Sequence, residues 1–192
     1  MTITGVILAG GQSSRFGKPK MFETWQGEPL YMTAVQAFQR ADLPYVISTN
    51  AQLAARFHVP KHALFIEEHT FEGPLYALSE VMKQHASDWF FVVAADMPFL
   101  NATFVQKLTV HISENIDAIV PYADEQVQPL AALYHRRILP IIEKTLQEKR
   151  KSMRAIFPHI RVQQVPFSNQ KTFTNINYVA DWPQHEKESH HE

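Results

Sequence analysis

A polar segment near the amino end combines residue types that bind phosphates. In residues 8–20, LAGGQSSRFGKPK, two adjacent glycines precede hydroxyl and cationic side chains. Glycines let a backbone turn sharply and approach a ligand, and consecutive N–H groups in such a loop form an anion site. Ser13 adds a hydroxyl, Arg15 a planar guanidinium and Lys20 a compact ammonium group, a set suited to a polyphosphate. The spacing matches neither the GxGxxG fingerprint nor the P-loop, and a plain turn between a strand and a helix is the alternative.

A single aspartate follows the most apolar run of the chain. Residues 89–95, WFFVVAA, are apolar throughout, as is typical of a central strand of a parallel sheet with both faces covered. Asp96 comes next, and Pro98 restricts the backbone of Met97. Magnesium is commonly bound by one or two carboxylates together with substrate phosphate oxygens, so Asp96 is a candidate Mg²⁺ ligand. A turn or helix-capping aspartate is the alternative.

Short apolar runs alternate with longer amphipathic stretches along the chain. The runs predict strands over residues 2–9, 45–49, 63–67, 89–95, 117–122, 129–134 and 161–165. The stretches predict helices over residues 29–41, 51–57, 74–85, 102–112 and 138–146, with a last turn over 179–184. This alternation predicts an α/β fold, a three-layer, doubly wound and mostly parallel sheet with helices on both faces. The link between the strands at 117–122 and 129–134 is too short for a helical crossover, which predicts a small antiparallel part late in the chain.

The fold class predicts where the polar residues meet. Ligands of doubly wound sheets bind beyond the carboxyl ends of the strands, so the loop over 8–20 and Asp96 should open onto one edge. The chain has 192 residues and a formal net charge of −1. It contains no cysteine, which excludes a disulfide scaffold, a zinc–thiolate site and thiol catalysis. We expect one domain over residues 1–184 with a disordered tail over 185–192, in a cytoplasmic protein that binds neither nucleic acid nor membrane.

The glycine-rich loop resembles the LAGG signature of the nucleotidyltransferases that activate sugars, alditols and pterins. The doubled glycine is most similar to the molybdenum cofactor guanylyltransferases, the MobA family. The resemblance implies a Rossmann-like nucleotidyltransferase fold, Mg²⁺ on Asp96, and GTP and molybdopterin as substrates, with other cofactor-assembly proteins as further partners. The candidate catalytic residues are Arg15, Lys20 and Asp96. The candidate nucleotide-binding residues are Leu8, Ala9, Gly10, Gly11, Ser13, Lys20, Asn50, Glu68, Gly73 and Asp96.

Several of these candidates have an equally good structural interpretation. Asn50 could read a purine edge, since an amide both donates and accepts, or could cap a helix. Gly73 lies in a Gly-Pro-Leu segment similar to one of the family, and Glu68 stands near the position of the family's aspartate, where a solvated strand end is the alternative. Asn175 and Asn177 resemble a late family string that would hold metal-bound water or the second substrate; turn asparagines are the alternative.

The leading hypothesis is transfer of GMP from GTP to the terminal phosphate of molybdenum-loaded molybdopterin, with release of pyrophosphate. A related nucleotidyltransferase that uses CTP, or a sugar or alditol phosphate acceptor, is one alternative. A non-catalytic GTP-binding partner in cofactor assembly is the other. The choice of guanine comes from the resemblance and not from a hydrogen-bonding pattern in the sequence.

Overall fold

A computed structural model describes residues 1–11, 17–168 and 170–174 of the chain. A central mixed sheet has the order β10-β7-β9-β6-β1-β4-β5, with β8 paired to β7. Its strands are β1 (Ile3–Leu8), β4 (Tyr45–Thr49), β5 (Leu64–Ile66), β6 (Trp89–Ala94), β7 (Ala118–Ala123), β8 (Gln126–Val127), β9 (Ala131–His135) and β10 (Val162–Pro166). The predicted fold class is confirmed, since β6, β1, β4 and β5 pair in parallel.

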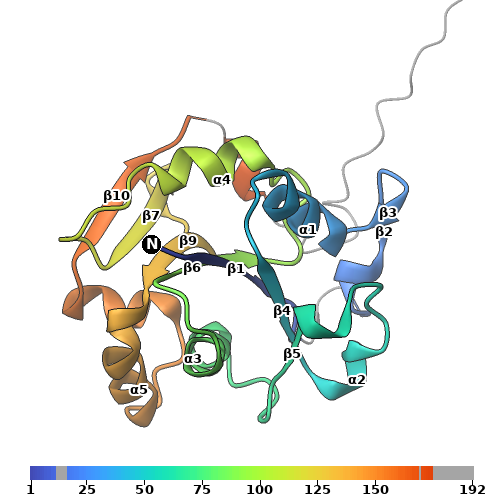
Figure 1. The fold of residues 1–192 in the computed structure, drawn as a ribbon, viewed down its shortest axis with the longest axis horizontal. Coiled ribbons are helices and arrows are strands. Elements are labelled where there is room, and N and C mark those ends of the chain that lie inside the picture. Colours follow the sequence, from blue (N-terminus) through green and yellow to red (C-terminus); the bar gives the residue numbers. More distant parts are fainter. Residues whose placement is uncertain (12–16, 169, 175–192) are drawn as a thin grey trace, which may run out of the picture.

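Helices cover both faces of this sheet (Figure 1). In the view of Figure 1, α1 and α4 lie above the sheet, and α3 and α5 lie below it. The α-helices are α1 (Tyr31–Arg40), α2 (Ala51–Ala54), α3 (Pro74–Gln84), α4 (Ala102–Thr109) and α5 (Leu139–Gln147). Short 3₁₀ turns are η1 (Lys20–Phe22), η2 (Lys61–Ala63), η3 (Arg136–Ile138), η4 (Met153–His159) and η5 (Gln170–Phe173). Within the described ranges, no helix is long and apolar enough to cross a membrane.

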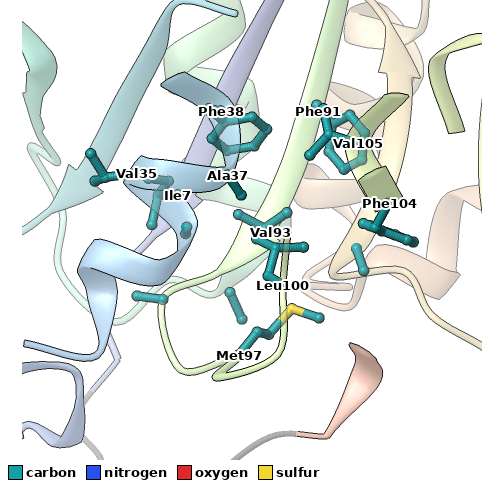
Figure 2. Packing of buried hydrophobic residues seen from close by; sticks show 14 of the residues in the cluster. Ile7, Val35, Ala37, Phe38, Phe91, Val93, Met97, Leu100, Phe104 and Val105 are labelled. Carbon is teal, nitrogen blue, oxygen red and sulfur yellow. The ribbon is translucent and has the colours of Figure 1, made fainter. Parts of the chain in front are cut away.

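The core between the sheet and the upper helices holds the strand ends in place. Phe38 from α1 and Phe91 from β6 pack edge to face with ring centroids 5.6 Å apart, and Figure 2 shows them beside Val105 of α4. Met97 is 3% exposed and packs in the same cluster, below Val93 in Figure 2. Because Met97 directly follows Asp96, its burial anchors the turn that carries this carboxylate.

The late antiparallel part is confirmed as well. Strand β9 runs antiparallel to both β6 and β7, with Phe91 opposite Leu133 and Ile119 opposite Leu133 in the two registers. Its amino end therefore lies at the same sheet edge as the carboxyl ends of its neighbours. The backbone confirms this, because Ala94 N–H donates to the Leu130 carbonyl, with 3.1 Å between nitrogen and oxygen.

The prediction that a helix begins at residue 29 was wrong. Pro29 belongs to a two-stranded hairpin, β2 (Thr24–Trp25) and β3 (Glu28–Pro29), and α1 begins at Tyr31. The two turn residues, Gln26 and Gly27, have φ values of 51° and 87°, as a tight hairpin turn requires. The last turn predicted over 179–184 and the tail over 185–192 lie outside the described residues.

Candidate active site

A cavity of about 370 Å³ opens at the carboxyl ends of the parallel strands. Its wall combines the loop after β1, the turn after β6, the start of η1 and the segment that leads into α3. The lining residues are Leu8, Ala9, Gly10, Gly11, Lys20, Met21, Glu67, Phe71, Gly73, Pro74, Ala77, Ala94, Ala95, Asp96 and Leu130. The predicted convergence of the glycine-rich loop and Asp96 at one sheet edge is therefore present in the structure.

Lys20 and Asp96 form an ion pair in this cavity. Lys20 Nζ lies 2.5 Å from Asp96 Oδ2, and the two side chains are only 13% and 18% exposed. The residues are 76 positions apart in sequence, so the fold brings them together rather than local geometry. A lysine and an aspartate so close and largely shielded from water form a strong local dipole at the cavity wall.

The hairpin that sequence reasoning missed positions this pair. Trp25 of β2 donates its indole N–H to the Pro98 carbonyl at 3.1 Å, which ties the hairpin to the turn after Asp96. On the other side, Met21 of η1 is 4% exposed and belongs to the core. Lys20 is thus held between a buried neighbour and a hairpin anchored to the Asp96 turn.

The second carboxylate oxygen of Asp96 is in a different environment from the one that pairs with Lys20. Asp96 Oδ1 is buried and has no hydrogen-bond partner among the described residues. A buried, unsatisfied carboxylate oxygen is costly, and such an atom calls for an explanation such as a bound ion. The described part of the chain contains no cluster of three or more His, Cys, Asp or Glu that could hold a metal. The donor set fits a Mg²⁺ ion that takes one protein carboxylate and completes its shell with water and phosphate oxygens.

Glu67 forms part of the cavity wall, whereas the candidate chosen from the sequence was its neighbour Glu68. Its side chain is buried, with the residue 7% exposed, and Ser48 Oγ donates to Glu67 Oε1 at 2.8 Å. Burial raises the pKa of the Glu67 carboxyl above its ordinary value, an effect that the Ser48 hydrogen bond opposes. A Cβ atom built on Gly10 would lie 2.8 Å from Glu67 Oε1, so this glycine leaves the space that the carboxylate fills.

Glu68 and Asn50 do not line the cavity. Glu68 is exposed at the end of the strand segment. Asn50 is buried, and its side-chain oxygen accepts the Leu53 N–H at 3.1 Å, which makes it the N-cap of α2. The structure therefore shows the helix-capping interpretation of Asn50 and puts Glu67 where a cavity carboxylate was expected from Glu68.

Phe71 and Gly73 contribute to the rim of the cavity from the segment that leads into α3. Both have positive φ, 64° and 92° respectively, which is uncommon for a bulky residue such as phenylalanine. A Cβ on Gly73 would also approach Lys151 Cβ to 3.3 Å, so glycine suits this position twice over. Lys151 itself pairs with Glu72 at 2.6 Å beside the rim. Ser13, Arg15, Asn175 and Asn177 lie outside the described residues.

Comparison with known proteins identifies the family. Residues 5–164 match the family model described as the MobA-like NTP transferase domain. The chain belongs to the MobA-like NTP transferase family. It is therefore a nucleotidyltransferase, and the cavity built on the loop after β1 is the candidate active site of this family member. A Geobacillus sp. (strain WCH70) protein described as a probable molybdenum cofactor guanylyltransferase is 33% identical over 182 residues, which span 91% of this chain and 93% of that protein.

Solved structures of similar fold support the architecture of this family member. The molybdopterin-guanine dinucleotide biosynthesis protein A from Archaeoglobus fulgidus aligns with a TM-score of 0.76 at 19% identity, over 93% of this chain and 94% of that one. The Mycobacterium tuberculosis H37Rv protein Rv0371c aligns with a TM-score of 0.79 at 13% identity, over 95% and 96% of the two chains. That protein has also been crystallised with manganese. At these identities the likeness establishes the fold alone.

Proposed function

We propose that the protein transfers GMP from GTP to the terminal phosphate of molybdopterin, in its free or molybdenum-loaded form. The Lys20–Asp96 pair, with one buried Asp96 oxygen left without a partner among the described residues in a cavity of nucleotide size, is the observation that carries the proposal. Membership of the MobA-like NTP transferase family and the named activity of the Geobacillus relative support the choice of substrates.

The reaction needs charge neutralisation more than a strong base. An oxygen of the acceptor phosphate attacks the α-phosphorus of GTP, the bond from the α-phosphorus to the bridging oxygen breaks, and pyrophosphate leaves with that oxygen. A phosphate monoester is already a competent nucleophile, so catalysis consists of positioning and electrostatic stabilisation. We assign to Asp96 the binding of a divalent cation, Mg²⁺ in this proposal, which supplies positive charge to the phosphate oxygens when bound.

The other cavity residues position the nucleotide. Lys20 binds the triphosphate once the nucleotide competes for its ammonium group, and the backbone N–H groups around Gly10 and Gly11 contact phosphate oxygens. Arg15 adds a guanidinium beside the phosphates in this scheme, and Gly73 lets the backbone at the rim approach the nucleoside. The low exposure of Lys20 and Asp96 strengthens each of these charge interactions relative to water.

The test is a panel of nucleotides and acceptors with purified protein. Pyrophosphate release is measured with each nucleoside triphosphate, with Mg²⁺, and with molybdopterin or a sugar or alditol phosphate as acceptor. We expect release with GTP and molybdopterin. Release only with CTP or with a sugar phosphate would replace the proposal by a related transferase, and GTP binding without release for any acceptor would indicate a non-catalytic partner.

Variants assign the roles within that assay. Asp96→Asn and Lys20→Met should each lower the rate by about 10²–10³-fold, because each removes a charge that acts on the transferred group. Lys61→Gln, a change at an exposed lysine outside the cavity, serves as the matched control. Thermal unfolding of all three variants verifies that they fold, and unaltered turnover in Asp96→Asn would exclude a role for this carboxylate.

A further inference from the structure

The turn that carries Asp96 contains two short-range hydrogen bonds. The Leu100 N–H donates to the Met97 carbonyl, with 3.5 Å between nitrogen and oxygen. Asn101 Nδ2 donates to the Phe99 carbonyl at 3.2 Å, a bond between residues two positions apart. Both bonds lie within the turn and move with it. They therefore shape the turn, but they do not fix its position relative to the other walls of the cavity.

A hydrogen bond from a distant segment supplies that fixed position. Trp25 is 8% exposed, and its indole N–H donates to the Pro98 carbonyl at 3.1 Å across 73 residues of sequence. The indole ring also packs edge to face on Phe99, with ring centroids 5.7 Å apart. Asp96 lies two residues before the accepting carbonyl, and Pro98 restricts the backbone between them. A shift of the Pro98 carbonyl would therefore displace the Asp96 carboxylate as well.

The same indole completes a ring of contacts around this carboxylate. Lys20, the first residue of η1, precedes Trp25 by five positions and pairs with Asp96 at 2.5 Å. The Glu23 N–H donates to the Lys20 carbonyl at 3.0 Å, so the chain between Lys20 and β2 is compact. From Trp25 the ring closes across the hydrogen bond to Pro98 and back along the turn. Breaking the indole bond opens this ring, although Trp25 lies outside the cavity lining that the described residues form.

The cation site proposed above depends on one protein carboxylate. The described part of the chain offers no group of three or more His, Cys, Asp or Glu as metal ligands. Neighbouring side chains would therefore not compensate for a displaced Asp96. Outer groups that orient a metal ligand commonly change metal affinity by about 10- to 100-fold.

We propose that Trp25 is a positioning residue of the cation site, whose indole N–H holds the Asp96 carboxylate in its cation-binding orientation through the Pro98 carbonyl. The inference rests on the proposed function for one point, the assignment of the divalent cation to Asp96. Lys20 has an anchor of its own, because the adjacent Met21 is buried in the core. Loss of the indole N–H should therefore weaken the part of nucleotide binding that depends on the cation and leave the metal-free part unchanged.

The test compares GTP affinity with and without a divalent cation. Calorimetric titration of the complete chain with GTP is carried out in Mn²⁺ and again in EDTA, and the ratio of the two affinities measures the contribution of the cation. Trp25→Phe removes the indole N–H and keeps an aromatic ring beside Phe99. We expect this ratio to fall about 10-fold in Trp25→Phe, with the affinity in EDTA unchanged. An unchanged ratio, including one in which affinity falls equally in both media, would overturn the assignment.

Further variants separate the hydrogen bond from the packing of the ring. In Trp25→His the imidazole Nε2 can take the place of the indole Nε1 and donate to the Pro98 carbonyl, so most of the parent ratio should be retained. Phe99→Leu removes the edge-to-face contact, leaves the indole N–H and should retain the ratio as well. A fall in either variant as large as that in Trp25→Phe would assign the effect to packing and overturn the proposal. If Trp25→Phe does not fold, Trp25→Leu makes the same comparison with an aliphatic side chain.

Trp89→Phe is the matched control. It removes an indole that is 2% exposed from the first residue of β6, at the opposite end of this strand from Asp96. It should keep the parent ratio, and thermal unfolding verifies that every variant folds. A fall equal to that in Trp25→Phe would show a general loss of order and overturn the positioning role.

The outcome is separable from that of the proposed function. A parent protein that transfers GMP to molybdopterin while Trp25→Phe keeps the parent ratio refutes the positioning role alone. A protein whose ratio falls in Trp25→Phe but that transfers nothing to molybdopterin refutes the proposed function alone. A parent protein whose GTP affinity is independent of the cation refutes the cation assignment, on which both depend.

Discussion

Alanine at Gly10 should destabilise the protein, whereas alanine at Gly11 should not. Neither glycine has a left-handed φ, so alanine causes no backbone strain at either position. The difference is steric: a Cβ on Gly10 would lie 2.8 Å from Glu67 Oε1 and 3.1 Å from Oε2, while a Cβ on Gly11 meets no atom of the described residues within 4 Å. Glu67 is buried and tied to Ser48, so it cannot simply swing away.

The expected magnitude follows from overpacking against a buried side chain. Added atoms in a packed interior cost about 1–3 kcal/mol. For a chain of this size each kcal/mol lowers the Tm by about 2–4 °C, so Gly10→Ala should lower the Tm by about 2–12 °C. Thermal unfolding followed by circular dichroism, without nucleotide, measures this loss, and Gly11→Ala is the internal control. The nucleotide is left out so that lost phosphate contacts do not contribute.

A double-variant cycle tests the stated cause. Glu67→Asp shortens the side chain that meets the new Cβ, so Gly10→Ala should cost less in the Glu67→Asp background, with a coupling of at least about 0.5 kcal/mol. Equal Tm losses for Gly10→Ala and Gly11→Ala, or strictly additive effects in the cycle, would show that the reasoning about this contact is wrong.

Three further predictions concern stability. Burial raises the pKa of the Glu67 carboxyl above 4.5. Between pH 4.5 and this raised pKa the folded state retains a proton that the unfolded chain loses, so the free energy of unfolding falls as pH rises through this range. Glu67→Gln should therefore raise the Tm at pH 8, with a smaller gain at pH 4. The hydrogen bond from Arg161 lowers the pKa of Asp117 from 3.8 to about 2, so its stabilisation is present above pH 3.8 and is lost as pH falls toward 2. Urea unfolding of Asp117→Asn should show a loss of about 1–2 kcal/mol at pH 7 and a smaller one at pH 2.5. Asn101 accepts the Phe104 N–H at 3.0 Å as the N-cap of α4; Asn101→Ala should cost about 1 kcal/mol in the same assay, and an unchanged midpoint would contradict the capping role.

The sheet and its loops could be predicted because their signals are local. Strand β4 has the predicted bounds. Strand β6 ends one residue earlier than predicted. It could be predicted because an unbroken apolar run indicates a strand that is buried on both faces. The cap at Asn101 is a local feature as well, since asparagine is a preferred N-cap residue. The meeting of Lys20 and Asp96 followed from the rule that parallel strands end at one edge, although no local pattern specifies their 2.5 Å contact.

The features that were predicted wrongly depended on which residues of a strand face inward or on contacts between distant parts of the chain. Glu67 and Phe65 are both buried, whereas Ile66 and Glu68 are exposed, so the two-residue period of a strand already indicated which glutamate points inward. The early hairpin had a signal too, in the glycine of its two-residue turn. Its short strands are stabilised by the indole bond from Trp25 to Pro98, a contact across 73 residues that no sequence window contains.

The reversed direction of β9 gives the cavity a wall of separate origin. Leu130 precedes β9 and lines the cavity from the side of β6 that is remote from the glycine-rich loop. The chain reaches Leu130 from the short β8 hairpin, and the Ala94 N–H joins Leu130 to the site by donating to its carbonyl. Substitution of Leu130 would alter this part of the wall, whereas the loops after β1 and β6 come from other segments of the chain. The cavity thus combines parallel strand ends with the start of a strand that runs the other way, and its wall comes from distant parts of the chain.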